Sequence, residues 1–406
     1  MVARIDHRQA ERNVQLYPWF KAFQSLLFWQ AVWFLFFQNT LSAAEAILLY
    51  AIFDLSTTVL EVPSGYLSDR VGRRPTLILA GLTGLAGASL LTLGHGFAVF
   101  ALAQVCLGAS QAFVSGTDSS LLFESLDRAG RSADVEAEEV KAWRFGFVAF
   151  AVSAAVGGAL GMFDPRLPFA ATVFAMAGML AIAIGFHEPG KNGQVVTERM
   201  RFRSLLHAFD QPVVRWMFVL SFSMYAFSHI PFVFGQPFIL QALATVGLEA
   251  EAPLVSGTLT SVMMLISVGV SLFARKLRKA IGLPAILLLA FGIQIALIAV
   301  LSLTDSIFAV LVLLLRMVPN SLAGPFILAR LQPLLGDETR ATYLSTQSLV
   351  GRLVLATSLL FASGVTSDQG TMVHAEISVI LGWYVAAGLL VIGGLIVAAR
   401  RITVEG

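Results

Sequence analysis

The feature that most limits the fold of this chain is a series of long apolar segments spread over its 406 residues. Each segment has roughly 20 residues, the length at which an α-helix crosses the hydrocarbon core of a bilayer. A helix satisfies its own backbone hydrogen bonds, so it can stand in lipid. Twelve such segments are present, at about 16–39, 44–66, 76–95, 97–123, 144–163, 167–187, 213–240, 253–274, 284–303, 306–330, 342–364 and 376–400. The pattern predicts an all-α polytopic membrane protein with twelve transmembrane helices.

Composition agrees with a membrane location. Hydrophobic residues make up 57% of the chain and charged residues only 13%, whereas a soluble domain has about 25% charged residues. The formal net charge of +2 gives no reason to expect a nucleic-acid partner. The single cysteine, Cys106, lies in an apolar segment, where a packing role is expected.

The first apolar segment needs to be distinguished from a secretory signal. Basic residues precede it and the small residues 42–44 follow it, as they do around a cleavage site. However, the segment is longer than the apolar core of a signal, and eleven further segments come after it. We therefore expect an uncleaved first transmembrane helix.

The distribution of charge predicts the orientation. With an even number of spans both termini share one side, and placing them in the cytoplasm leaves Arg166 as the only cation of the external loops. Basic residues accumulate in cytoplasmic loops, so both termini are expected on the cytoplasmic side of the cytoplasmic membrane. The cations placed inside are Arg4, Arg8, Arg12, Lys21, Arg70, Arg73, Arg74, Arg128, Arg131, Lys141, Arg199, Arg201, Arg203, Arg275, Lys276, Arg278, Lys279, Arg340, Arg400 and Arg401.

The chain also divides into two pseudo-symmetric halves. A hydrophilic stretch predicts a cytoplasmic linker at 189–212 between a six-helix half at 1–188 and a second at 213–406. A basic segment beginning at Ser271 is a degenerate copy of the one beginning at Gly65, at an offset of 271 − 65 = 206 residues. This copy keeps the basic character and replaces the acid by Arg275, but it loses the glycines. The two halves are therefore expected to be internal structural repeats.

The ten residues Gly65-Tyr66-Leu67-Ser68-Asp69-Arg70-Val71-Gly72-Arg73-Arg74 form a charged segment between two apolar ones. We expect a tight loop in which the two glycines allow a sharp reversal and the arginines stay on the cytoplasmic side. The segment resembles the loop between the second and third helices of the major facilitator superfamily, whose pattern Gly-x-x-x-Asp-Arg/Lys-x-Gly-Arg/Lys-Arg is matched at every defined position. An ordinary basic loop of another polytopic protein is the alternative.

The ends of the second and fourth apolar segments resemble a bacterial, drug-transporter-like branch of this superfamily. The resemblance implies a conformational latch, in which Asp69 and Arg73 pair with Glu124 and stabilise the outward-open state. The alternative is that these are solvated loop charges worth little energy. The latch set is Gly65, Asp69, Arg70, Gly72, Arg73, Arg74 and Glu124.

Ionisable residues inside the membrane are costly and usually functional or paired. Burial favours the neutral form of a carboxyl group, which can then exchange a proton near physiological pH. Asp54, near the middle of the second segment, is the preferred proton carrier, and an ion pair with Arg316 or Arg352 is the alternative. The proton-coupling candidates are Asp54, Asp118, Glu61 and His229.

Aromatic residues in several segments are candidates for the wall of a substrate cavity. For any single one, packing between helices or contact with lipid is the alternative. The candidates, with two cations that could hold a carboxylate, are Trp29, Trp33, Phe34, Phe37, Tyr50, Tyr225, Phe227, His229, Phe232, Arg316 and Arg352.

Two departures from the resemblance weaken the expectation of antiport. The fourth segment has Gln104 where many facilitators have a buried arginine. The fifth keeps the glycine pair Gly157-Gly158 of the antiporter signature without its preceding Gly-Pro.

The expected function is secondary active transport by alternating access, with export of an amphipathic organic compound by proton antiport. The alternatives are proton-coupled import of an organic anion, held by Arg316 and Arg352, and a non-transporting membrane receptor. No nucleophile–base pair or metal-binding motif predicts an enzyme, a cofactor or a metal. The expected partners are a small-molecule substrate, protons and the lipid bilayer, with the chain as a monomer.

Overall fold

The computed structural model describes residues 7–189, 207–331, 334–335, 337–366, 372–402 and 404, without the side chains at 62, 136 and 337–342. Every regular element in these ranges is a helix. The chain divides into two compact units, the first formed by residues 1–194 with 253–258 and the second by 195–252 with 259–406. The predicted linker, 189–212, falls mostly on residues 190–206, outside the described ranges, so its boundaries stay a prediction.

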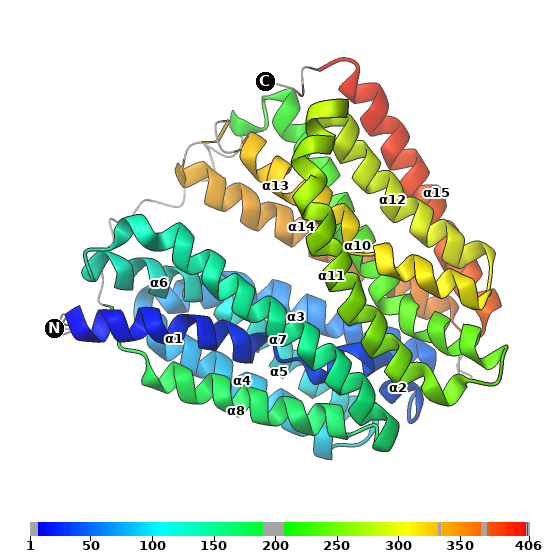
Figure 1. Cartoon of the computed structure of the whole chain (residues 1–406), viewed down its shortest axis with the longest axis horizontal. Coiled ribbons are helices and arrows are strands. Elements are labelled where there is room, and N and C mark those ends of the chain that lie inside the picture. Colours follow the sequence, from blue (N-terminus) through cyan, green and yellow to red (C-terminus); the bar gives the residue numbers. More distant parts are fainter. Residues whose placement is uncertain are drawn as a thin grey trace. The chain divides into compact units, whose positions relative to one another are not determined.

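The first unit contains the elements coloured blue to green in Figure 1. They are α1 (His7–Ser25), η1 (Phe28–Ala31), α2 (Trp33–Gln38), α3 (Ala43–Val71), α4 (Arg73–Leu93), α5 (Gly96–Val114), α6 (Thr117–Arg128), η2 (Ser132–Asp134), α7 (Val135–Phe163) and α8 (Leu167–Gly185).

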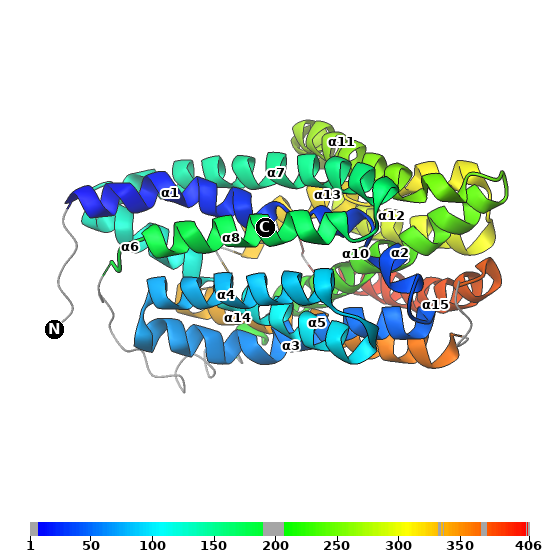
Figure 2. The same ribbon diagram turned by 90° about the horizontal axis from the view of Figure 1, so that it is seen from below.

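Within the first unit the helices lie in two layers. Figure 2 shows α1, α7 and α8 in one layer and α3, α4 and α5 in the other, with α4 packed on both α5 and α8. Phe20 of α1, Leu77 of α4 and Met179 of α8 are buried in a shared apolar core. Small residues allow the close approach of α4 to α8, since a Cβ on Gly81 would come within 2.9 Å of the backbone of Leu180.

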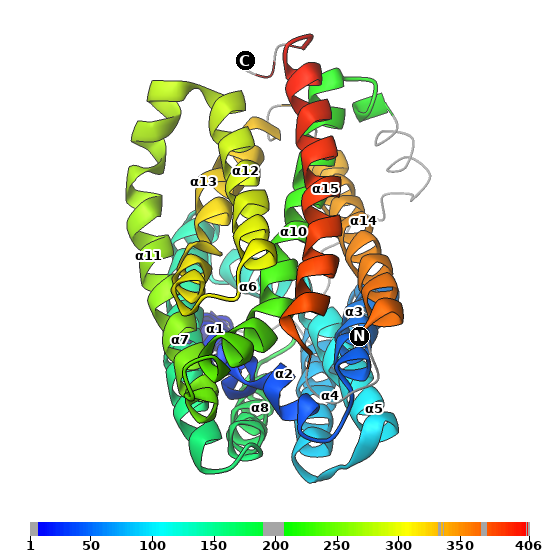
Figure 3. The same ribbon diagram turned by 90° about the vertical axis from the view of Figure 1, so that its right-hand side faces the viewer.

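The second unit is also built from helices. Figure 3 shows α12 between α13 and α15, and α10 packs against α14. Its elements are α10 (Pro212–Ala244), η3 (Glu249–Glu251), α11 (Ala252–Ile281), α12 (Leu283–Leu303), η4 (Ile307–Leu315), α13 (Val318–Leu331), α14 (Asp337–Val365) and α15 (His374–Ala399).

The described ranges contain eleven helical segments long and apolar enough to cross a membrane, and they correspond to the second through twelfth predicted spans. The predicted first span, 16–39, is not one continuous helix, because the chain leaves α1 after Ser25 and continues as η1 and α2. At this break the backbone of Phe28 packs directly on α7, where a Cβ on Gly157 would overlap the carbonyl of Phe28. The predicted class, an all-α membrane protein, is confirmed, with a divided first span.

The fourth and tenth predicted spans are also divided. Gly116 adopts φ = +73°, a left-handed conformation that ends the helical path between α5 and α6. The tenth span begins as the 3₁₀ element η4 and becomes α-helical only at Val318. The break at Gly116 places Asp118 in the first turn of α6, where a carboxylate interacts favourably with the helix dipole.

Each unit contains a turn in which a single glycine joins two helices. Gly72 joins α3 to α4 with φ = +126° and ψ = +162°, and Gly282 joins α11 to α12 with φ = +84° and ψ = +166°. Both glycines are followed by a helix of 21 residues. The structural offset is thus 282 − 72 = 210 residues, and the expectation that the second copy loses both glycines was wrong.

Candidate functional site

The segment predicted as a ten-residue loop is mostly helical. α3 continues through Val71, so Gly72 alone separates it from α4. A Cβ at Gly72 would lie 2.8–2.9 Å from the carboxylate of Glu188, and the backbone there has a positive φ. Gly65 lies inside α3 with open space around it, so its predicted part in the reversal was wrong.

The carboxylate of Glu188 caps the N-terminus of α4. Its Oε1 accepts a 2.9 Å hydrogen bond from the backbone N–H of Arg73, and its Oε2 accepts a 2.8 Å bond from that of Arg74. These N–H groups have no partner within the helix, and the helix dipole attracts negative charge there. Glu188 was not among the predicted latch residues, since it follows α8 and is distant from α4 along the chain.

Arg73 lies at the centre of a charge cluster that joins the α3–α4 turn to α6. Its Nη1 lies 2.6 Å from Asp69 Oδ1, and its Nη2 lies 3.1 Å from Glu124 Oε1. Nη1 also donates a 2.8 Å bond to Ser68 Oγ. Asp69 is 70% exposed while Arg73 and Glu124 are each 19% exposed, so the bond to Glu124 is the better protected one. The structure therefore brings together the three residues at the centre of the predicted latch.

The other two arginines of the predicted latch point elsewhere. Arg70 is exposed, and its guanidinium contacts the Tyr66 hydroxyl at 3.0 Å. Arg74 donates a 2.9 Å bond to the carbonyl of Ile184 near the end of α8.

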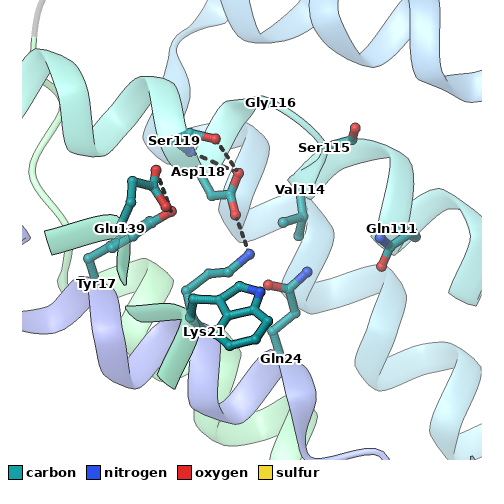
Figure 4. A pocket seen from close by; sticks show the side chains of 11 residues that line it. Tyr17, Lys21, Gln24, Gln111, Val114, Ser115, Gly116, Asp118, Ser119 and Glu139 are labelled. Carbon is teal, nitrogen blue, oxygen red and sulfur yellow. Dashed lines mark hydrogen bonds and ion pairs between the residues drawn. The ribbon is translucent and has the colours of Figure 1, made fainter. Parts of the chain in front are cut away.

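A polar cavity of about 290 Å³ lies in the first unit, lined by α1, α5, α6 and α7 (Figure 4). Tyr17, Lys21 and Gln24 face it from α1, with spacings of four and three residues that place them on one side of the helix. Trp143 of α7 also lines it. In the described part of the chain, no group of three His, Cys, Asp or Glu residues could hold a metal ion.

Two charged interactions cross this cavity. Lys21 Nζ lies 2.7 Å from Asp118 Oδ2, and the Asp118 side chain is only 6% exposed. The Tyr17 hydroxyl lies 3.2 Å from both oxygens of the Glu139 carboxylate. Figure 4 shows Gln24 on the same side as Lys21, and its buried Oε1 has no hydrogen-bond partner among the described residues. Asp118 was an expected proton site; Lys21, counted only as a cytoplasmic cation, proves to be its partner.

The other two carboxyl candidates of the first unit lie on α3. Asp54 is 2% exposed, within the apolar stretch Ala43–Glu61. Glu61, at the end of that stretch, is partly buried and accepts a 3.2 Å hydrogen bond from Ser115 Oγ at the break between α5 and α6. Asp54 is therefore the carboxyl most fully enclosed in the apolar part of α3.

In the second unit two arginines lie over aromatic rings. The guanidinium of Arg316 is 5.2 Å from the ring centroid of Phe232, and that of Arg352 is 5.8 Å from that of Tyr225. His229 lies one turn from Tyr225 on α10, with Nδ1 2.7 Å from the Tyr225 carbonyl oxygen. The structure thus brings four predicted residues, Tyr225, His229, Arg316 and Arg352, into contacts that involve α10.

The aromatic candidates of the first unit differ in exposure. Trp33 and Phe37 are at most 1% exposed, and Phe37 packs on Phe100 with centroids 5.3 Å apart. Their burial and ring contacts agree with the alternative of packing between helices, and a place on a cavity wall stays a prediction. Tyr50 packs on Trp33 at 5.4 Å and is partly buried, as is Trp29, whose Nε1 has no partner among the described residues.

The chain is similar to known proteins both in sequence and in structure. Quinolone resistance protein NorA of Staphylococcus aureus is 25% identical over 199 residues, which cover 46% of this chain and 48% of NorA. The chain thus matches about half the length of its curated relatives. The nucleoside transporter NupG superposes with a TM-score of 0.75 at 12% identity, covering 96% of this chain and 98% of NupG.

A peptide transporter, POT, superposes with a TM-score of 0.69 at 13% identity, covering 97% of this chain and 95% of POT. At such identities the structural likeness establishes the fold alone. The sequence model of the Major Facilitator Superfamily matches residues 19–359, most of the chain. This multi-pass membrane protein belongs to the Major Facilitator Superfamily.

Proposed function

We propose that this protein exports an amphipathic organic compound across the cytoplasmic membrane in exchange for protons. The superfamily consists of transporters, and the relative NorA is named for quinolone resistance. Export is the simplest way in which a membrane transporter confers resistance to a compound. We therefore take a NorA-like activity as the leading proposal, although the match spans only about half of each chain.

The observation that carries the proton-coupled part is the burial of Asp54. Its side chain lies in the apolar stretch of α3 with 2% exposure, where a charged carboxylate costs about 2.5–3.5 kcal/mol. Asp54 is proposed to take up a proton in one conformation and to release it in another, in which water reaches its carboxyl group.

The charge contacts of α6 supply a mechanism for conformational control. Gly116 separates α6 from α5, so α6 can tilt about this point. Two ion pairs hold it, from Asp118 to Lys21 of α1 and from Glu124 to Arg73 of α4. The Arg73–Glu124 pair is partly exposed, and such pairs contribute about 1 kcal/mol or less, a value that allows repeated breaking during transport. We propose that these two pairs fix one conformation and open in the other.

The experiment that tests the function is transport by purified protein in proteoliposomes. A panel of amphipathic cations and organic anions is assayed with a proton gradient imposed in each direction. Export coupled to proton entry supports the proposal. Substrate movement unaffected by either gradient, in vesicles that hold the gradient, would contradict proton coupling.

A second candidate is proton-coupled import of an organic anion. The observation that favours it is the pair Arg316 and Arg352, each on an aromatic face within the membrane-crossing segments of the second unit. An arginine guanidinium donates paired N–H bonds that match the two oxygens of a carboxylate. The same panel separates the two, because only the importer accumulates an organic anion in the direction of proton flow.

A further inference from the structure

The second unit contains a basic cavity of about 510 Å³ where α11 ends and α12 begins. Arg275, Arg278 and Lys279 of α11 and Arg330 of α13 line it. The apolar part of its wall is formed by Leu283, Pro325, Phe326 and Ala329. No carboxylate among the described residues lines this cavity.

The cations converge by their positions on the helices. Arg275, Arg278 and Lys279 are spaced by three and four residues, so they share one face of α11. The guanidinium of Arg278 lies 5.7 Å from the ring centroid of Phe326 on α13. Arg330 Nε donates a 2.9 Å bond to the carbonyl of Val404, which orients its guanidinium. Four positively charged side chains therefore line one cavity, part of whose wall is apolar.

The corresponding turn of the first unit contains carboxylates beside its arginines. There Gly72 occupies the position of Gly282, and carboxylates of Asp69, Glu124 and Glu188 surround Arg73. Like charges in one cavity repel, and the repulsion is stronger beside apolar walls than in water. The first unit thus supplies its own counter-ions, whereas among the described residues the second unit supplies none to its basic cavity.

We propose that the basic cavity at Gly282 binds the phosphate group of an anionic ligand. Arginine donates paired N–H bonds that match phosphate oxygens, and a basic pocket between membrane helices is suited to a lipid headgroup. Leu272 and Phe273 lie one turn before Arg275 and are 76% and 65% exposed. They provide an apolar surface for acyl chains beside the cavity, which favours an anionic phospholipid as the source of the phosphate.

The test measures binding to the purified full-length protein. Phosphatidylglycerol and phosphatidylcholine are titrated separately in detergent, with retained lipid counted by native mass spectrometry. Inorganic phosphate is a third probe, at constant ionic strength. The variant Arg278→Gln/Lys279→Gln is compared with Lys276→Gln, because Lys276 is an exposed cation of the same helix that does not line the cavity.

At about fivefold per removed cation, the double variant should bind phosphatidylglycerol roughly 25-fold more weakly. Lys276→Gln should change the affinity by less than about twofold, and phosphatidylcholine should bind weakly to all forms. The swap Arg278→Lys/Lys279→Arg keeps both charges and should retain binding, which controls for misfolding. Tighter binding of inorganic phosphate than of phosphatidylglycerol would identify a soluble phosphate as the ligand of the same site.

Two results would overturn the proposal. One is an equal loss of phosphatidylglycerol binding in the double variant and in Lys276→Gln, which indicates diffuse attraction to a basic surface. The other is the absence of saturable binding of both phosphatidylglycerol and inorganic phosphate to the folded wild-type protein.

Discussion

Lys21 and Asp118 form a 2.7 Å ion pair that ties α1 to the first turn of α6. The Asp118 carboxylate is almost fully enclosed, and its second oxygen accepts the backbone N–H of Ser119 at 2.8 Å. Removal of the lysine would leave a buried carboxylate without its cationic partner, which costs more than the loss of an exposed pair.

The first prediction follows from this pair. Lys21→Met should lower the free energy of unfolding by about 1–3 kcal/mol, between the values for exposed and buried pairs. The double variant Lys21→Met/Asp118→Asn should recover part of this loss, because the stranded charge is gone. Lys141→Met is the control, since Lys141 is 51% exposed in its pair with Glu138. Equal destabilisation by the two lysine substitutions in thermal unfolding would show that the Lys21–Asp118 pair contributes no more stability than an exposed pair.

The second prediction distinguishes the two glycines of the charged segment. Gly72→Ala should destabilise the protein by about 1–3 kcal/mol, because it combines a positive φ with a clash against Glu188. Gly65→Ala should be neutral or stabilising by about 0.5–1 kcal/mol, since Gly65 lies in a helix with open space around it. Thermal unfolding of the two variants in the same detergent measures the difference. A larger loss for Gly65→Ala would contradict the described turn.

The third prediction concerns the Arg73 cluster as a latch. Arg73→Ala should reduce the transport rate at least about fivefold, the equivalent of about 1 kcal/mol, and shift the population between inward-open and outward-open forms. Asp69→Asn should act in the same direction but more weakly, because Asp69 is 70% exposed. Arg70→Ala is the control, because Arg70 is exposed and its guanidinium contacts the Tyr66 hydroxyl of its own helix. Unchanged distance distributions between spin labels in Arg73→Ala would show that the cluster serves topology or folding alone.

The fourth prediction concerns orientation. In a Cys106→Ser background, a cysteine at Lys276 should react with an impermeant reagent only from the cytoplasmic side, and one at Gly247 only from outside. This follows from the accumulation of basic residues near Lys276 and of acids at 249–251. Labelling from the opposite faces would reverse the proposed topology.

Much of the fold could be predicted from the sequence, because length and hydropathy determine whether a segment crosses a membrane. The break after Ser25 could not, since residues 26–32 contain neither glycine nor proline. Its partner, Gly157, is far away in the sequence and admits the Phe28 backbone only in the folded unit. The Gly116 break did leave a local signal, a glycine within the polar sequence Ser115-Gly116-Thr117-Asp118-Ser119-Ser120, but the predicted span 97–123 was continued through it.

The site was predictable where charges are close in the sequence or follow a known pattern, as for Asp69 and Arg73. The partners Lys21 and Glu188 were missed, because each comes from a distant helix end and has another plausible role there. The register of the internal repeat was misplaced by four residues, since aligned basic side chains were followed instead of the glycine that forms the turn. Gly282 was the signal that could have corrected it.

The measurement that tests the central proposal most directly is proton-driven transport by Asp54→Asn in proteoliposomes. Asparagine mimics the protonated carboxyl permanently, so accumulation driven by a proton gradient should vanish while substrate counterflow continues. Asp305→Asn is the matched control, because Asp305 is exposed between α12 and η4 and should retain coupled transport. An Asp54→Asn protein that still concentrates its substrate in response to a proton gradient would contradict the role of Asp54 as the proton carrier.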